Sequence, residues 1–196
     1  MIGYALLIAT VTAVVGLLLS GERSARVIAL GAALALVATV AVGELAATRT
    51  SFATGFLLGG AVAWSMTDYR TGYIRNALMI PLAIVLITLG CIENGWLATI
   101  IGALTCGGVF AVFRFVQWGS VGGGDVLAAT CVGAALGAPA GPLGISIGLA
   151  VALLAALLTC GPNMMRMYRL RIRMGPYMAA GALAAILLPS LPFALR

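Results

Sequence analysis

The chain contains only two aspartates, and each lies at the edge of an apolar segment. Asp68 closes one apolar run, and Asp125 follows three consecutive glycines, Gly122, Gly123 and Gly124. When two carboxylates share a site, one keeps its proton near neutral pH, so the pair supplies a general base and a general acid. Such a pair can activate a water for direct attack on a peptide carbonyl. We therefore expect Asp68 and Asp125 to form a catalytic pair.

Two structural roles compete with this interpretation. Asp125 could be the N-cap of a helix, because Asp is a favoured N-cap residue and glycines commonly precede one. Asp68 and Arg70 could form an ordinary polar pair at a membrane surface. An acidic residue at the edge of a membrane is nonetheless a candidate functional residue.

The composition indicates that lipid surrounds most of the chain. Of the 196 residues, 63% are hydrophobic and 8% are charged, and the mean hydropathy is +1.16. An ordinary soluble domain is about 45–50% apolar and about 25% charged. We therefore expect a polytopic, all-α membrane bundle that forms a single domain over residues 1–196.

The residue types that are missing exclude several chemistries. The chain has no His and no Lys, which excludes Ser-His-Asp, Cys-His and Ser-Lys nucleophilic sites and H-E-x-x-H zinc sites. Its four cysteines form no C-x-x-C pair and are predicted to be packing residues, with no disulfide, no metal site and no cofactor. They are Cys91, Cys106, Cys131 and Cys160.

About eight transmembrane helices are expected, of which the sixth and the eighth are short for a span of about 20 residues. The first has no basic region before it, which predicts a retained helix and not a cleaved signal. The predicted spans are 2–20, 27–42, 52–66, 77–91, 96–113, 126–136, 143–160 and 177–188.

The arginines set the predicted orientation, because cytoplasmic loops carry the excess of basic residues. With eight spans and the N-terminus outside, nine of the eleven arginines lie on the inner side, and so do Asp68 and Asp125. Without a sixth crossing, the four arginines of the run Arg166–Arg173 would fall on the outer side. This run is expected to contact anionic membrane lipid, and no nucleic-acid partner is expected.

Three segments resemble those of the type IV prepilin peptidases. Residues 68–76, Asp-Tyr-Arg-Thr-Gly-Tyr-Ile-Arg-Asn, resemble the family's D-x-R-x-x-x-I-P-N segment, and Gly122–Asp125 matches its G-x-G-D motif. Residues 174–177, Met-Gly-Pro-Tyr, resemble its F-G-P-F segment. The three occur in the family's order and extend over most of the chain from Asp68 to Gly181.

The resemblance implies an aspartyl endopeptidase of the inner membrane, which removes the short basic leader from prepilin-like precursors at the cytoplasmic face. By this resemblance, Asp68 and Asp125 are expected to be the catalytic residues. The glycines Gly122, Gly123 and Gly124 are expected to let an extended substrate approach the main chain. Two positions depart from the family pattern: Arg75 stands where Pro is usual, and Leu127 where Lys is usual.

A third departure concerns the loop between the first two spans. Full-length relatives carry a cytoplasmic domain there, often with paired C-x-x-C motifs, which is linked to N-methylation of the trimmed pilin. Here the loop is only Gly21–Arg26, so peptidase activity is expected without methyltransferase activity.

Three other functions stay open from the sequence. One is an intramembrane aspartyl protease of the presenilin or signal-peptide-peptidase type, whose first motif lies inside a helix. Another is a small transporter or proton-coupled carrier that uses the aspartates as a relay, which predicts acids near the bilayer midplane. The last is an inactive relative of the prepilin peptidases that acts in pilus assembly.

Overall fold

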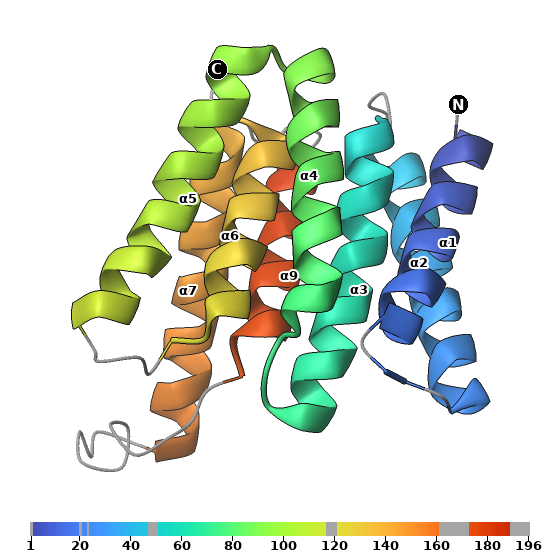
Figure 1. Cartoon of the computed structure of the whole chain (residues 1–196), viewed down its shortest axis with the longest axis horizontal. Coiled ribbons are helices and arrows are strands. Elements are labelled where there is room, and N and C mark those ends of the chain that lie inside the picture. Colours follow the sequence, from blue (N-terminus) through green and yellow to red (C-terminus); the bar gives the residue numbers. More distant parts are fainter. Residues whose placement is uncertain are drawn as a thin grey trace.

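The computed structural model describes residues 2–19, 21–22, 24–46, 51–116, 121–160 and 173–188, and these form helices and no strand. The predicted all-α bundle is confirmed (Figure 1), and the predicted sixth and eighth helices, α6 and α9, are the shortest, with 14 residues each. The helices are α1 (Ile2–Leu19), α2 (Ala25–Ala46), α3 (Phe52–Thr71), α4 (Asn76–Glu93), α5 (Trp96–Val116), α6 (Gly123–Leu136), α7 (Ala140–Cys160) and α9 (Met174–Leu187).

Successive helices run in alternate directions. The C-terminal end of α3 and the N-terminal ends of α4, α6 and α9 therefore meet at one end of the bundle, the lower end in Figure 1. The described arginines all belong to this lower end, which agrees with one basic side of a membrane; they are Arg26, Arg70, Arg75, Arg114 and Arg173. The remainder of the predicted basic run, from Arg166 to Arg171, lies outside the described residues.

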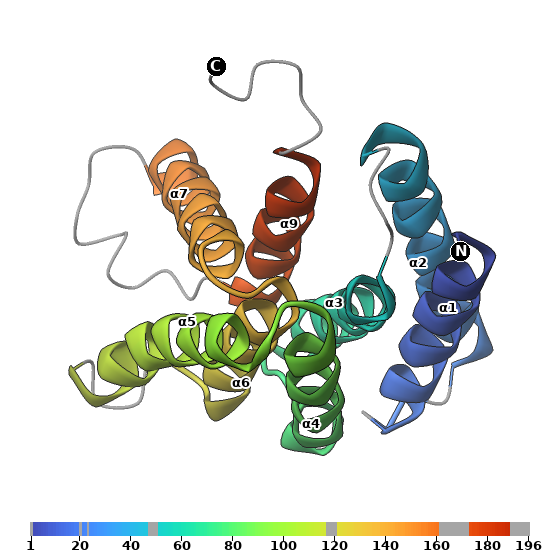
Figure 2. The same ribbon diagram turned by 90° about the horizontal axis from the view of Figure 1, so that it is seen from above.

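Helix α6 runs through the middle of the bundle. It packs against α3, α4, α5, α7 and α9 (Figure 2), and most of its side chains are buried. Small residues make this possible: a methyl group on Gly102 of α5 would lie 2.3 Å from the carbonyl oxygen of Gly133 of α6. Close backbone approach of this kind is how helices associate in lipid, and it explains how a helix of 14 residues is held.

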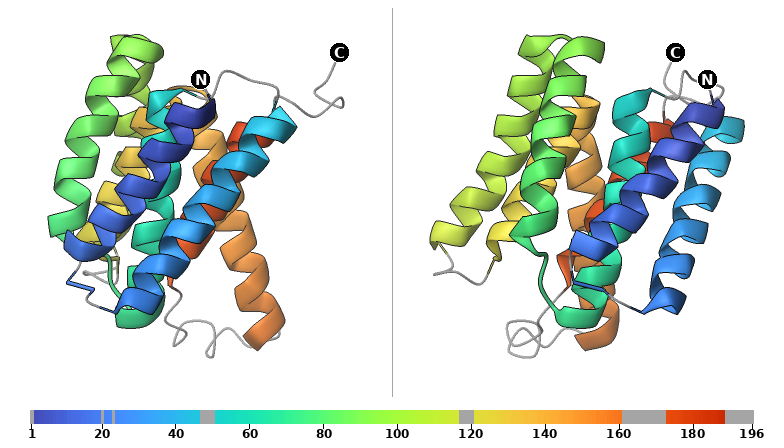
Figure 3. Two further views of the ribbon diagram at one scale, coloured as in Figure 1. Left: turned by 90° about the vertical axis from the view of Figure 1, so that its right-hand side faces the viewer. Right: turned by 45° about the vertical axis from the view of Figure 1, so that its right-hand side comes forward.

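The outward faces of the bundle are apolar. Helices α1 and α2 lie side by side along α3 (Figure 3), and α1, α2, α4, α5 and α7 all carry exposed large hydrophobic side chains. Leu104 of α5 and Leu158 of α7, for example, are 70% and 78% exposed. A helix on the surface of a water-soluble protein would be polar on this face, so these faces are suited to lipid.

Three helices of the described chain are long and apolar enough to cross a membrane by themselves: α4, α5 and residues 140–159 of α7. Shorter apolar segments lie in α1, α2, α6 and α9. The structure therefore supports a helical membrane bundle, whereas eight separate crossings stay a prediction.

The helix boundaries correct the sequence interpretation near the first aspartate. Asp68 was expected just beyond the end of its helix, but α3 continues through the polar residues to Thr71. Gly72 ends it by adopting a left-handed conformation (φ +75°) and donating its N–H to the carbonyl oxygen of Asp68 at 2.8 Å. Glycine adopts this conformation without steric cost. Asp68 is consequently held on a rigid helix.

The cysteines that the structure describes are free thiols. Cys106 and Cys131 are buried where α5 and α6 pack together, in agreement with the predicted packing role, and Cys91 is half-buried.

Candidate active site

Asp68 lies in the last turn of α3 and is almost completely buried, with 3% of its surface exposed. Its Oδ2 accepts a hydrogen bond of 2.8 Å from the main-chain N–H of Gly175, in the first turn of α9. The neighbouring Arg70 forms its ion pair with Glu22, in the connection between α1 and α2. The ion pair of Arg70 is thus made with Glu22, and a polar pair of Asp68 with Arg70 stays a prediction.

Asp125 lies in the first turn of α6 and is half-buried. Gly122 is the N-cap of this helix, and Asp125 is its third residue. The Oδ2 of Asp125 accepts a hydrogen bond of 2.9 Å from the N–H of Gly122. Asp125 is therefore not the N-cap residue itself, but its side chain does cap the start of the helix as the third residue of a capping box, so the predicted capping role is present in this form.

The environment of Asp125 favours its protonated form. Burial raises the pKa of the Asp125 carboxyl above its ordinary value of 3.8, the N–H of Gly122 opposes this rise, and the charge of Asp68 adds to it. The contribution of Asp68 to this rise agrees with the position of both aspartates at the same end of the bundle. A carboxyl that keeps its proton to a higher pH than an exposed aspartate is the kind of group that can donate a proton in acid–base chemistry.

The two aspartate segments are also packed against each other. A methyl group on Gly124 would lie 2.3 Å from the carbonyl oxygen of Ile74, so this glycine permits direct contact between the two backbones. At Gly123 the nearest atom of the described residues to such a methyl group is Oδ1 of Asn76, at 4.0 Å. Gly124 therefore has a packing role, while no side chain of the described residues fills the space beside Gly123.

Two residues that the sequence did not single out for a role contact this site. Gly175 bonds to Asp68, and its carbonyl oxygen accepts a hydrogen bond of 3.3 Å from Nε1 of Trp64. Gly175 belongs to the Met174–Tyr177 segment, and this resemblance was the only sequence signal for it. Trp64 is one tryptophan within an apolar run, a pattern that does not distinguish it from a core residue.

A polar cavity of about 180 Å³ lies beside the C-terminal end of α3, at the same end of the bundle as Asp68. Its polar lining includes Glu22, Arg70 and Arg75. The guanidinium of Arg75 reaches across to the turn at Gly21, where a methyl group would lie 2.6 Å from its Nη1. Neither aspartate lines this cavity.

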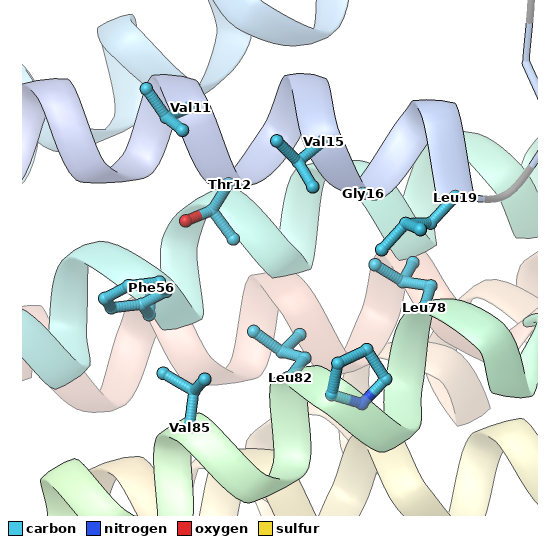
Figure 4. A pocket seen from close by; sticks show the side chains of 10 residues that line it. Val11, Thr12, Val15, Gly16, Leu19, Phe56, Leu78, Leu82 and Val85 are labelled. Carbon is cyan, nitrogen blue, oxygen red and sulfur yellow. The ribbon is translucent and has the colours of Figure 1, made fainter.

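A second cavity, of about 220 Å³, lies between α1 and α4 with Phe56 of α3 beside it (Figure 4). Its lining is almost entirely apolar and contains no charged residue. It can accept a hydrocarbon chain or an apolar side chain but offers few hydrogen-bond partners to a peptide backbone. The residues that line it are Val11, Thr12, Val15, Gly16, Leu19, Phe56, Leu78, Pro81, Leu82 and Val85.

Comparison with known proteins identifies the family. The model of the type IV leader peptidase family matches residues 55–162, which is more than half of the chain and includes both aspartates. No curated protein and no solved structure matches the chain. The family match covers the two segments that the structure brings together at the lower end of the bundle. The chain therefore belongs to the type IV leader peptidase family.

Proposed function

We propose that this chain is a membrane aspartic endopeptidase that cleaves the leader from type IV prepilin-like precursors. One observation carries the proposal: Gly124, next to Asp125, packs on the carbonyl oxygen of Ile74 in the segment that follows Asp68, so the two aspartate segments of the matched region lie together at one end of the bundle. The family match supports a leader peptidase in general, and the carboxyl pair supplies a chemical mechanism for it.

In this mechanism Asp68 is the general base and Asp125 the general acid. Asp68 takes a proton from a water, whose oxygen adds to the carbonyl carbon of the scissile peptide bond while Asp125 donates its proton to the carbonyl oxygen. The C–N bond then breaks, and a proton held by the pair passes to the leaving nitrogen. The reaction needs no covalent intermediate, no metal and no cofactor.

The glycines before Asp125 are proposed to receive the substrate. Within the described part of the chain, the space beside Gly123 leaves room for an extended peptide next to the main chain, and Gly122 is half-buried at the same surface. Gly124 contributes indirectly, because its contact with Ile74 holds the segment in place. A local stretch of extended substrate is required, since peptide bonds inside a helix are shielded by their own hydrogen bonds and side chains.

The proposed location is the inner membrane, with several membrane crossings and the aspartates at the cytoplasmic face. The described arginines lie at the same end as the aspartates, and an excess of basic residues marks the cytoplasmic side. The substrate is a precursor with a basic leader, presented from the surrounding lipid. The connection from Leu19 to Ala25 is short, so methyltransferase activity is not part of the proposal.

The positions of the aspartates argue against a proton-coupled carrier. A relay of that kind places its acids near the bilayer midplane, whereas Asp68 lies in the last turn of α3 and Asp125 in the first turn of α6. An inactive relative that assists pilus assembly has the same fold, and only an activity measurement separates it from an enzyme.

The experiment uses the full chain in proteoliposomes and a prepilin-like precursor with a basic leader. Mass spectrometry should find a single cut at the end of the leader. The new C-terminus of the leader should be a carboxylate even when hydroxylamine is added, because water attacks the peptide bond directly. A matched precursor whose leader arginines and lysines are replaced by glutamine should be cleaved more slowly. Failure to cut the precursor, or formation of a leader hydroxamate, would overturn the proposal.

A further inference from the structure

We propose that Gly175 is a positioning residue for Asp68, and this proposal rests on the aspartic peptidase function above. The main-chain N–H of Gly175 holds the carboxylate through the 2.8 Å hydrogen bond to Oδ2. Both residues are buried. Gly175 lies 107 positions after Asp68 in the chain, so the start of α9 completes a site whose acids come from α3 and α6.

The absence of a side chain at residue 175 is part of this role. A methyl group there would lie 3.0 Å from both Cβ and Oδ2 of Asp68, which is closer than carbon atoms normally approach. The carboxylate would have to rotate, or the start of α9 would have to withdraw from α3. Either movement lengthens the hydrogen bond and displaces the base from its position.

The peptide unit of Gly175 is held from a second point on α3. The indole Nε1 of Trp64 donates to the Gly175 carbonyl oxygen at 3.3 Å, and Trp64 is completely buried. Trp64 and Asp68 are four residues apart, so they lie on the same face of the helix. The backbone of Gly175 is thus fixed on both sides, and its N–H is directed at the carboxylate.

The same contact has an electrostatic effect on Asp68. Gly175 is in the first turn of α9, where N–H groups have no partner within the helix and the helix dipole favours a negative charge. Among the described charged groups, Asp68 raises the pKa of Asp125 on α6, Arg70 is paired with Glu22, and Arg173 before α9 donates to a main-chain carbonyl of α3. The contact with α9 therefore selects Asp68 as the base of the pair.

The test compares Gly175→Ala with Gly108→Ala in the full chain, reconstituted in proteoliposomes. Gly108 is the matched control, because a methyl group there meets no atom of the described residues within 4 Å. Gly175→Ala should lower kcat by about 10-fold to 100-fold, as expected for a displaced catalytic group, with KM changed less than about twofold. The acid limb of its pH–rate profile should move to higher pH, since the carboxylate loses a donor that stabilises its charge. Gly108→Ala should match wild type in kcat, in KM and in the acid limb of the pH–rate profile.

A second variant keeps the proposal testable if Gly175→Ala does not fold. Trp64→Phe retains an aromatic ring but removes the indole N–H, and it should lower kcat and shift the acid limb in the same direction by smaller amounts. If Gly175→Ala folds and shows the wild-type kcat and pH profile, the proposal is overturned while the peptidase function stays intact. If only Trp64→Phe folds, the same result for that variant overturns the proposal in the same way. A wild-type chain that does not cleave, or an Asp68→Asn variant that cleaves normally, would overturn both.

Discussion

The main chain of Gly124 packs directly on the carbonyl oxygen of Ile74, so closely that a methyl group on this glycine would lie 2.3 Å from that oxygen. Ile74 belongs to the segment that follows Asp68, and Gly124 immediately precedes Asp125. The contact therefore joins the two aspartate segments, which are far apart in the sequence, into one packed unit. Interaction between the two carboxyls depends on this unit staying intact.

Alanine at residues 124 and 123 should have different effects. Gly124→Ala forces the two backbones apart and should lower the free energy of unfolding by about 1–3 kcal/mol, as overpacking does, with a parallel loss of cleavage. Gly123→Ala should stay within about 0.5 kcal/mol of wild type but slow cleavage, because its methyl group occupies the space proposed for substrate. Unfolding in detergent and the cleavage rate measure the two effects. Equal losses of stability in both variants would contradict the packing role of Gly124.

The raised pKa of Asp125 predicts how cleavage depends on pH. Asp125 must be protonated to donate, and burial together with the charge of Asp68 keeps its proton at pH values above the ordinary 3.8. Cleavage should therefore persist above that value and fall as pH rises through the raised pKa of Asp125. A pH–rate profile of the reconstituted enzyme measures this alkaline limb. A rate that keeps rising with pH would show that Asp125 does not act as the acid.

The same shift predicts a pH dependence of stability. The folded chain binds a proton at Asp125 more tightly than the unfolded chain, so the stability linked to this group is present below pH 3.8 and is lost as pH rises through the raised pKa. Asp125→Asn should remove this dependence. Unfolding of wild type and variant over the same pH range tests it, and identical curves would contradict the assignment.

Arg75 can be replaced by the proline that is usual in the family. Its backbone is extended (φ −79°, ψ 131°) at the N-cap of α4, and its N–H donates no hydrogen bond within the described part of the chain. Proline fits this φ value, so Arg75→Pro should leave stability unchanged or raise it by about 0.4–1 kcal/mol. Cleavage should be retained. A loss of stability above about 1 kcal/mol would show that the Arg75 side chain at the turn of Gly21 is structurally important.

The sequence predicted the helices well because lipid imposes a simple rule on them. Apolar runs of sufficient length, such as those of α4 and α5, were recognised almost to their ends. The end of α3 was missed because Asp68, Tyr69 and Arg70 are polar, and hydropathy does not show that a helix continues through them to Gly72. The start of α7 at Ala140 was missed in a similar way, since glycine and proline near it resemble a break.

The two aspartates of the site could be predicted from the sequence, but the residues that hold them in place could not. Asp68 and Asp125 stood out because the chain has no other aspartate and each belongs to a recognisable segment. The roles of Gly175 and Trp64 depend on how α9 lies against α3, which no local pattern in the sequence specifies. Likewise, the contact of Gly124 with Ile74 is a property of the assembled bundle.

The most direct test of the account is cleavage of a prepilin-like precursor by Asp68→Asn and Asp125→Asn, with Glu93→Gln as the matched control. Glu93 is a carboxylate at the opposite end of the bundle, where it accepts from the N–H of Ala53, and glutamine preserves an acceptor. Each asparagine variant should insert and fold but lose at least about 100-fold in rate, as expected when a general acid or base is removed, while Glu93→Gln cleaves like wild type. Cleavage at the wild-type rate by either asparagine variant would contradict the account.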